Sequence, residues 1–448
     1  MSIDVAALRS RLESMGIDVL RVLYCDVLGL TRSKDLLVSQ LARSAAHGPA
    51  FCQGVWVTTT RGGVLDGNDI MSTGLPDLVT VIDPESVTVL PWEPGVAYVV
   101  ADAYNADATA SELAPRSILQ NVLARYEALG MRAVVGPELE FYIAARGEHG
   151  WQRALEATGR VYTTGAWVDP DGTFLHLLRM LDGMDIGVFA GNHEFSPSQY
   201  EINLWHGEAL RAADRTFMFK TAIKDIVART GKLATFVGKP WSDEGGSGFH
   251  LHFSVEDLDG NNLMHTGTEL SSRANAMIAG ILENAPALVA FTNPTVNAYK
   301  RLGPDTLAPY RANWGHDNRS TMLRVPPERG AGTRLEVRVG DGAANPYLVI
   351  AAILAAGLDG IERSLTVPPA ADGWAYENET AAVLPMTLGS ALDALSGNER
   401  MRELLGGPLV DVFTMMKRDE VERYEAEVED PATRDVTQWE LDEYLEAY

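Results

Sequence analysis

The sequence predicts an α+β protein with two domains, a small and mostly β domain over residues 1–110 and a larger α+β domain over residues 111–448. Two features favour this division. Up to about residue 110, short apolar runs alternate with turn residues, which is typical of short strands. Beyond that point, helical periods of apolar residues alternate with strand-like runs. The chain has 448 residues, of which 46% are hydrophobic and 22% charged, so it is long enough for more than one globular domain.

The first domain is expected to begin with an amphipathic helix in "MSIDVAALRSRLESMGIDVL". Five apolar runs then predict short strands: "DVLRVLYCDVLGL", "PAFCQGVWVTTT", "DLVTVI", "TVLPWE" and "VAYVVADAY". Turn signals lie between them at Asp66-Gly67 and at Pro84. The second domain is expected to begin near Ala114-Pro115-Arg116, where "SELAPRSILQNVLARYEALGM" has a helical period. The acidic stretch "RDEVERYEAEVEDPATRDVTQWELDEYLEAY" near the C-terminus predicts helices with solvated charged faces.

The charge balance limits the possible partners. The chain carries 37 basic and 61 acidic residues, a formal charge of −24, and no basic run, so nucleic acid and anionic membrane surfaces are disfavoured. The two cysteines, Cys25 and Cys52, cannot form a disulfide framework and have no metal-type spacing. The N-terminus lacks an apolar signal core, and no stretch approaches the ~20 apolar residues of a membrane span. We therefore expect a cytoplasmic protein with small-molecule partners.

The stretch "GPELEF" places two glutamates within an apolar run. In a strand, positions i and i+2 share a face, so Glu138 and Glu140 would point the same way, a few ångströms apart. Carboxylates that close together need cations between them. The alternative is that the pair lies on a solvent-facing sheet surface, which is the commoner case for a single E-x-E pair.

Three further segments weaken the solvent-facing alternative. Each places charged or imidazole side chains between apolar runs: Glu194 and Glu201 in "HEFSPSQYEINLW", His250 and His252 after the glycine-rich loop Gly245 to Gly248, and Glu336 and Arg338 in "TRLEVRVGDGAANPY". Several glutamates with an imidazole and no thiolate make an oxygen-rich site that suits magnesium or manganese rather than structural zinc. The carboxylates are numerous enough for two ions.

Arginines accumulate downstream of these segments, at Arg301, Arg319, Arg324, Arg334 and Arg338. Carboxylates that hold divalent ions, together with arginines that bind anions, are what phosphoryl transfer requires. The glycine-rich loop lacks the spacing of a P-loop. From the residues alone, the sequence predicts a two-metal phosphoryl-transfer site, and a two-metal hydrolase is an open alternative.

At these positions the sequence strongly resembles the bacterial type I glutamine synthetase family, nearly from end to end. The matching elements are "YCDVLGLTRSK", "GPELEF", "HEFSPSQYEI", "GKPWSDEGGSGFHLHFS", "NPTVNAYKRL", "NRS" and "TRLEVRVGDGAANPYL". The resemblance implies a β-grasp-like N-terminal domain and a large glutamine-synthetase-type catalytic domain. It also implies a homo-oligomer, a dodecamer of two hexameric rings with active sites between neighbouring subunits.

The resemblance further implies a role for each site residue. The metal ligands would be Glu140, Glu194 and Glu201 for the ion near the amino acid, and Glu138, His250 and Glu336 for the ion near the nucleotide. The substrate-binding residues would be Glu140, Gly246, His250, Arg301, Leu307 and Arg338, of which Arg301 and Arg338, with the backbone at Gly246, would grip glutamate. Residues on the ATP side would be His252, Ser254, Arg319, Arg324 and Arg334, of which Arg319 and Arg324, with Arg338, would act in catalysis. The implied cofactors are ATP and two or three Mg²⁺ or Mn²⁺ ions.

Departures from the family pattern concern the amine. Leu307 stands where glutamine synthetases carry a glutamate that binds ammonium, and Cys52 or Gln53 stands where they carry an aspartate. Ammonium needs negative charge around it, and this site has lost two carboxylates. Leu307, with Trp205, Trp241 and Trp314 in neighbouring loops, would favour an amine with an alkyl or aryl portion.

The sequence therefore predicts an ATP-dependent ligase that joins the γ-carboxylate of glutamate to a primary amine, such as a polyamine or ethanolamine, through γ-glutamyl phosphate. Gly245, which replaces an asparagine of the family, leaves open an altered amino-acid pocket. The alternatives are a glutamine synthetase that uses ammonium, a ligase for another acid, and a non-catalytic binding or structural member of the fold.

Overall fold

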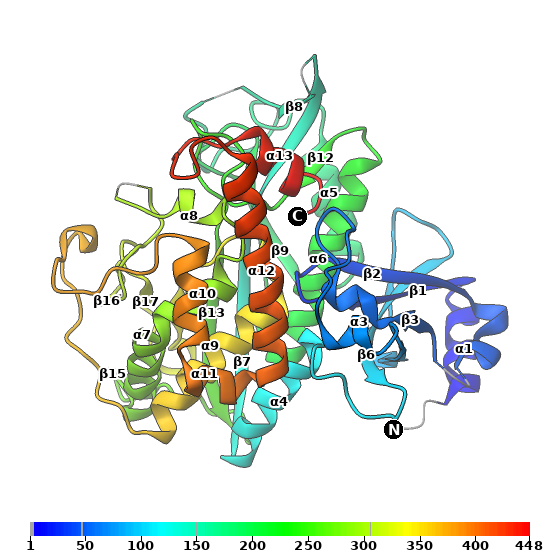
Figure 1. Ribbon diagram of the computed structural model, residues 1–448, viewed down its shortest axis with the longest axis horizontal. Helices are drawn as coiled ribbons and strands as arrows, with labels where there is room; N and C mark the ends of the chain where they lie inside the picture. The colour runs from blue at the N-terminus through cyan, green and yellow to red at the C-terminus, as the bar shows by residue number, and fades with distance from the viewer. Residues whose placement is uncertain (1–3, 46–47, 149, 157, 305) are drawn as a thin grey trace.

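The computed structural model describes residues 4–45, 48–148, 150–156, 158–304 and 306–448. It confirms the predicted α+β class. An N-terminal part built around one sheet lies beside a larger part in which helices pack on a second sheet (Figure 1, blue to cyan at the right for the N-terminal part).

The N-terminal sheet has six strands in the order β2-β1-β6-β4-β3, with β5 also paired to β6. The strands are β1 (Val19–Cys25), β2 (Thr31–Leu37), β3 (Ala50–Cys52), β4 (Asp77–Ile82), β5 (Thr88–Val89) and β6 (Val96–Asn105). Helix α1 (Val5–Ser14) buries Leu8 and Leu12 against the residues of β1 and β6 that face it. Short helices α2 (Leu41–Ala45) and α3 (Asp69–Ser72) complete this part.

One predicted strand is only partly correct. The run "PAFCQGVWVTTT" forms β3 over its first residues, but Gln53–Val57 forms a 3₁₀ turn instead of continuing the strand. Trp56 and Val57 are consecutive and both buried. Because a strand sends consecutive side chains to opposite faces, it would have exposed one of them. The turn buries both.

The catalytic sheet has ten strands in the order β16-β17-β18-β13-β7-β10-β9, with β8, β11 and β12 also paired to β7. Its central strand is β7 (Met131–Gly147). The other strands are β8 (Gly150–Arg153), β9 (Val188–His193), β10 (Gln199–Leu204), β11 (Gly207–Glu208), β12 (Leu233–Thr235), β13 (Phe249–Asp257), β16 (Trp314–His316), β17 (Leu323–Val325) and β18 (Leu335–Val337). Leu139 and Phe141 of β7 are fully buried in the core, which leaves the alternate positions of this strand on the other face.

Helices cover the core side of this sheet. They are α4 (Pro115–Ala128), α5 (Thr173–Gly183), α6 (Ala209–Ala228), α7 (Ser272–Thr292), α9 (Pro346–Glu362), α10 (Leu388–Ser396), α11 (Glu399–Leu405) and α12 (Gly407–Glu427). Helices α7 and α9 lie against each other so closely that a Cβ added to Gly280 would be 2.2 Å from the Ala356 carbonyl oxygen. Glycine is required there because the two backbones touch.

Helix α7 corrects the expectation that no stretch approaches a membrane span. By length and composition its 21 residues could cross a membrane, with a mean hydropathy of 1.3. In the folded chain, however, 78% of the most apolar 18-residue stretch of this helix is buried, mainly against α9. The helix is mostly apolar because protein surrounds most of it, and its charged Glu283 lies on the exposed side.

The C-terminal prediction is also corrected. The acidic stretch forms α12 and α13 (Gln438–Tyr444), but its charges are not all solvated, because Glu420, Glu440 and Glu443 are buried. Each has a basic partner, respectively Lys417, Lys300 and Arg423. Buried carboxylates persist in a protein when such partners are present.

Arg116 connects the two parts of the molecule. It lies at the start of α4, is 5% exposed, and pairs with Asp214 of α6 at 2.8 Å. Its other nitrogens reach Asp102 of β6 at 2.5 Å and Asp83, which follows β4, at 2.8 Å. One guanidinium thus balances three carboxylates from both parts.

We expect Arg116→Met to lower the free energy of unfolding by roughly 3–5 kcal/mol, because it removes the bidentate charge partner of the buried Asp214 and one partner each of Asp83 and Asp102. The matched control is Arg125→Met on the same helix, which removes a part-exposed pair with Glu362 and should cost about 0–1 kcal/mol. Urea denaturation of both variants measures the difference. Equal losses of unfolding free energy in the two variants would show that Arg116 does not stabilise the contact between the two parts of the molecule.

Candidate active site

Strand pairing places the predicted site residues on one face of the catalytic sheet. Glu138 of β7 lies directly opposite His250 of β13, and Glu140 lies directly opposite Glu201 of β10. On the other side of β13, His252 lies opposite Glu336 of β18. Segments up to about 200 residues apart in the chain therefore converge on one surface.

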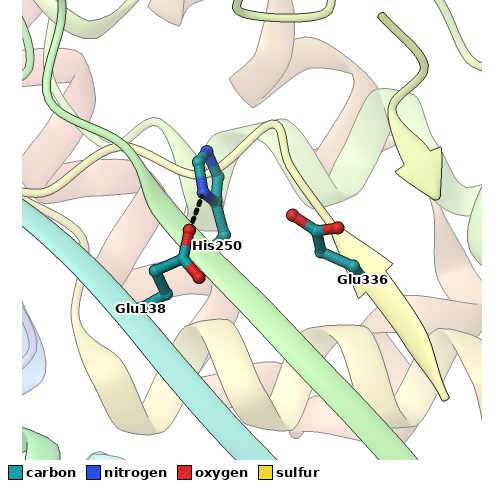
Figure 2. A group of neighbouring side chains, drawn as sticks. All are labelled: Glu138, His250 and Glu336. Atoms are coloured by element: carbon teal, nitrogen blue, oxygen red, sulfur yellow. Dashed lines mark hydrogen bonds and ion pairs between the residues drawn. The ribbon is translucent and has the colours of Figure 1, made fainter. Parts of the chain in front are cut away.

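Glu138, His250 and Glu336 form a compact group (Figure 2). One potential ligand atom from each lies within 4.8 Å of the other two. His250 Nδ1 is 3.0 Å from Glu138 Oε1, and His252 Nε2 is 3.6 Å from the other oxygen of Glu138. Two carboxylates and an imidazole at this spacing could hold a divalent cation.

Glu140, Glu194 and Glu201 lie beside this group and are held by neutral donors. Gln199 Nε2 and the Gly248 N–H donate to Glu140 at 3.1 and 2.9 Å. Asn192 donates to Glu194, and Asn203 donates to Glu201, each at 2.9 Å. These amides orient the carboxylates without neutralising them.

The two sets of carboxylates differ in their proton affinity. Burial alone would raise the pKa of Glu138, but hydrogen bonds with His250 and His252 hold it well below its usual range. Burial likewise acts to raise the pKa of Glu336, but Arg338 and the nearby imidazoles lower it to about 2.

Glu194 and Glu201 behave in the opposite way. Burial, followed by the charge of Glu140, raises the pKa of Glu194 to about 7. Burial, followed by the charges of Glu138 and Glu140, raises the pKa of Glu201 to about 9. Without cations, Glu201 holds a proton at neutral pH and Glu194 is partly protonated.

A cavity of about 400 Å³ opens next to Glu138. Three predicted nucleotide-side residues, His252, Ser254 and Arg334, line it. The aromatic rings of Phe189 and Trp205 also line it and stack with centroids 4.2 Å apart. The cavity thus has apolar walls near a charged group, as nucleotide sites do.

Two predicted ATP-side residues lie elsewhere. Among the described residues that line the cavity, Arg319 and Arg324 are not found. Arg324 is bound to Glu336 at 2.7 Å and to Asp317, whereas Arg319 is exposed. Arg338 is also paired to Glu336. In this structure Arg324 and Arg338 neutralise Glu336.

Arg301 and Gly246 lie in contact, as the prediction requires. A Cβ on Gly246 would be 2.1 Å from Cγ of Arg301, so only glycine allows this approach. Arg301 is buried, and its Nη2 donates to the carbonyls of Val339 and Gly340 at 2.6 and 2.5 Å. Its Nε has no hydrogen-bond partner among the described residues.

The residues that carry the amine prediction differ in their environment. Leu307 is 49% exposed, on a loop where its φ of 60° lies in the left-handed region. Cys52 is exposed at the end of β3. Trp314, by contrast, is buried and donates to the Pro368 carbonyl at 2.8 Å, and Trp205 lines the nucleotide-side cavity. These two tryptophans therefore do not support the predicted amine pocket.

Sequence reasoning missed several neighbours of the carboxylates. Asn192 and Asn203 lie two residues from Glu194 and Glu201, so the strand period could have indicated them. Tyr162 had no such signal, because it lies in an irregular loop. Burial and the charge of Glu194 raise the pKa of Tyr162, although the residue is exposed.

Comparison with known proteins agrees with this arrangement. The family model described as "Glutamine synthetase, catalytic domain" matches residues 112–444. The glutamine synthetase of Halobacterium salinarum is 33% identical over 98% of this chain and 95% of its own length. That of Pyrococcus horikoshii is 34% identical over 96% of each chain. The chain belongs to the glutamine synthetase family.

Solved structures of this family have the same fold. The ADP complex of GmaS superposes with a TM-score of 0.85 at 31% identity and covers 99% of both chains. GmaS without ligand gives a TM-score of 0.83 at the same identity and coverage. The protein is therefore a ligase of the glutamine synthetase type, a family that uses ATP, divalent metals, glutamate and an amine or ammonia.

The opposite pKa shifts predict how this glutamine synthetase relative responds to pH without metal. A carboxyl whose pKa is raised on folding stabilises the fold below its unfolded value, and this stability is lost as pH rises through the folded pKa. For Glu194 and Glu201 the loss runs from about pH 4.5 to about 7 and about 9. We expect the melting temperature of the EDTA-treated protein to fall over this range.

The variant Glu201→Gln tests the assignment, because its difference from wild type isolates one carboxyl. Its melting temperature should fall less between pH 7 and 9 than that of wild type. Mg²⁺ or Mn²⁺ should stabilise wild type more as pH rises, because ions and protons compete for these oxygens. An unchanged slope in Glu201→Gln would contradict the prediction.

Proposed function

We propose that the protein is an ATP-dependent ligase that joins the γ-carboxylate of glutamate to a primary amine through γ-glutamyl phosphate. The observation that carries the ligase chemistry is the group formed by Glu138, His250 and Glu336 beside the cavity that His252, Ser254 and Arg334 line. The choice of an amine over ammonium rests on Leu307. The similarity to GmaS, which was solved as an ADP complex, supports a nucleotide substrate.

Two or three divalent cations, Mg²⁺ or Mn²⁺, fit the donors on this face. Glu138, His250 and Glu336 would hold an ion on the nucleotide side, and Glu140, Glu194 and Glu201 one or more on the glutamate side. Oxygen donors with a single imidazole favour these hard cations. When bound, such ions bind phosphate oxygens and neutralise charge during phosphoryl transfer.

In the first step, the glutamate γ-carboxylate attacks the γ-phosphorus of ATP, and the bond to the ADP oxygen breaks. Arg301 would hold the glutamate against the backbone of Gly246, and its Nε, which makes no hydrogen bond and only a 3.8 Å ion pair with Asp341, supports this assignment. Arg338 would also contact glutamate, and Arg319 and Arg324 would stabilise the transferring phosphoryl group. Arg324 and Arg338 would then need to share their contacts with Glu336.

In the second step, the amine nitrogen attacks the acyl carbon and phosphate leaves. The amine must lose a proton, and Tyr162, whose pKa is raised by burial and by the charges of Glu194 and Glu201, is a candidate to take part, since Glu201 itself is assigned to a cation. Leu307 contributes no charge for an ammonium ion, but it offers exposed apolar surface to an alkyl or aryl group. This favours ethanolamine, polyamines or similar amines as substrates.

The rest of the assignment follows the family. We propose a boundary between domains at residues 110 and 111, and a homo-oligomer, a dodecamer of two hexameric rings. In such a ring, the exposed end of β3 with Cys52 and Gln53 would approach the site of a neighbouring subunit. Free Cys25 and Cys52 are in keeping with the reducing cytoplasm.

The second candidate is a glutamine synthetase that uses ammonium. The names of the Halobacterium salinarum and Pyrococcus horikoshii relatives favour it. In this case Glu201 and Tyr162 would have to supply the polar environment of ammonium without the carboxylate that Leu307 replaces.

Phosphate release with Mg²⁺, ATP and glutamate separates the candidates. We expect ethanolamine, putrescine or spermine to support turnover better than ammonium, with aniline as the aryl probe. If ammonium alone supports turnover, the amine-ligase proposal is wrong. If ATP binds but no amine is used, the non-catalytic alternative is favoured.

We further expect Leu307→Glu to raise ammonium-dependent kcat/KM by about tenfold, because a carboxylate near the amine site attracts ammonium. The control is Leu307→Gln, which has a similar shape without the charge and should not produce this gain. Both variants are assayed with ammonium and ethanolamine. If Leu307→Glu keeps the wild-type amine preference, Leu307 does not face the amine.

A further inference from the structure

The helix that carries Arg301 is too short to hold its own position. Helix α8 (Ala298–Arg301) has four residues, so its polar backbone groups are those of helix ends and need outside partners. Many of these partners come from the C-terminal segment 434–440. Arg434 donates to the carbonyls of Tyr299, Lys300 and Leu302 at 3.0, 2.9 and 2.8 Å.

Glu440 of α13 adds a buried ion pair to this contact. Lys300 Nζ donates to Glu440 Oε2 at 2.5 Å and to the Asp435 carbonyl at 2.6 Å. Glu440 is 1% exposed and Lys300 is 7% exposed. Lys300 directly precedes Arg301, so this pair fixes the helix next to Arg301.

The second oxygen of Glu440 is connected through Asn297 to Lys239, in the segment that leads to the glycine-rich loop. Asn297 Nδ2 donates to Glu440 Oε1 at 2.8 Å. The same amide group accepts from the Lys239 N–H and donates to the Lys239 carbonyl, both at 2.8 Å. Lys239 begins the loop that leads to Gly246. One carboxylate therefore connects both chain segments that meet at Arg301 and Gly246.

We propose that Glu440 is a positioning residue that sets glutamate affinity by holding Arg301 and Gly246 at their contact distance. The inference rests on the proposed function, in which these two residues bind glutamate. Glu440 does not touch the ligand, but misplacing a binding group by about 1 Å can cost ~10²-fold in rate. Because the connection runs through buried groups, a neutral side chain in place of Glu440 would loosen both the segment that carries Arg301 and the segment that carries Gly246.

Helix α13 provides a matched control. Glu443 lies one turn after Glu440, is 2% exposed and also carries buried ion pairs. Its partners are Arg423 at 2.9 Å and Arg61 of the N-terminal part at 2.9 Å. Glu440 and Glu443 thus share burial and helix but differ in whether they contact α8.

The test compares Glu440→Gln with Glu443→Gln in the full-length protein. Calorimetry with Mg²⁺ and saturating ADP should show glutamate binding weakened by about tenfold in Glu440→Gln. ADP affinity should change less than about twofold in either variant, and Glu443→Gln should keep wild-type glutamate affinity. The inference would be overturned if Glu440→Gln kept wild-type glutamate affinity, or if both variants lost glutamate affinity to the same extent.

Arg434→Met covers the case in which Glu440→Gln does not fold, because Arg434 is an exposed residue and its loss leaves no buried charge. It should also weaken glutamate binding, and wild-type affinity in this variant would count against the inference.

Hydrogen exchange of segments 296–304 and 238–248 gives a readout that does not need glutamate. If wild type binds no glutamate, the proposed function fails. Faster exchange in Glu440→Gln alone still supports positioning, and unchanged exchange overturns it.

Discussion

Repulsion among carboxylates on one face of the catalytic sheet is the constraint that shapes the site. Five glutamates converge there, namely Glu138, Glu140, Glu194, Glu201 and Glu336. Like charges so close cannot all be ionised without counter-charges. The surrounding imidazoles, guanidinium groups and amides follow from this requirement, because each one lowers the cost of a neighbouring carboxylate.

These counter-charges are distributed unevenly, so the carboxylates on this face fall into two groups that lie side by side. Glu138 and Glu336 have positive or hydrogen-bonding partners within the protein, so both carboxylates are ionised before a cation binds. Glu194 and Glu201 have mainly amide partners and hold protons instead. A cation on this side must replace protons, so its occupancy depends more strongly on pH. The two sides of the face therefore already differ electrostatically within the chain itself.

Local patterns predicted this site well, and long-range partners did not appear in them. The i, i+2 spacing of Glu138 and Glu140 showed that they share a face, since this depends only on the geometry of one strand. That His250 would lie opposite Glu138 required the pairing of β7 with β13, more than 100 residues apart, which only the family resemblance implied. The solvated tail was mispredicted for the same reason, because the partner of Glu440 is a lysine 140 residues earlier. Boundaries of short elements such as Gln53–Val57 depended on burial of neighbouring side chains, which the sequence does not display.

The alternation of β7 and β13 has a consequence for strand registration. Glu138 and Glu140 repeat at the spacing of His250 and His252, so a shift of β13 by two residues would still pair glutamate with histidine. Such a shift keeps every apolar side chain in the core, and hydrophobic burial alone does not discriminate against it. Discrimination has to come from the strands on either side, where His252 of β13 lies opposite Glu336 of β18 and Glu140 of β7 lies opposite Glu201 of β10. The flanking strands thus determine which of the two registers β13 adopts on β7.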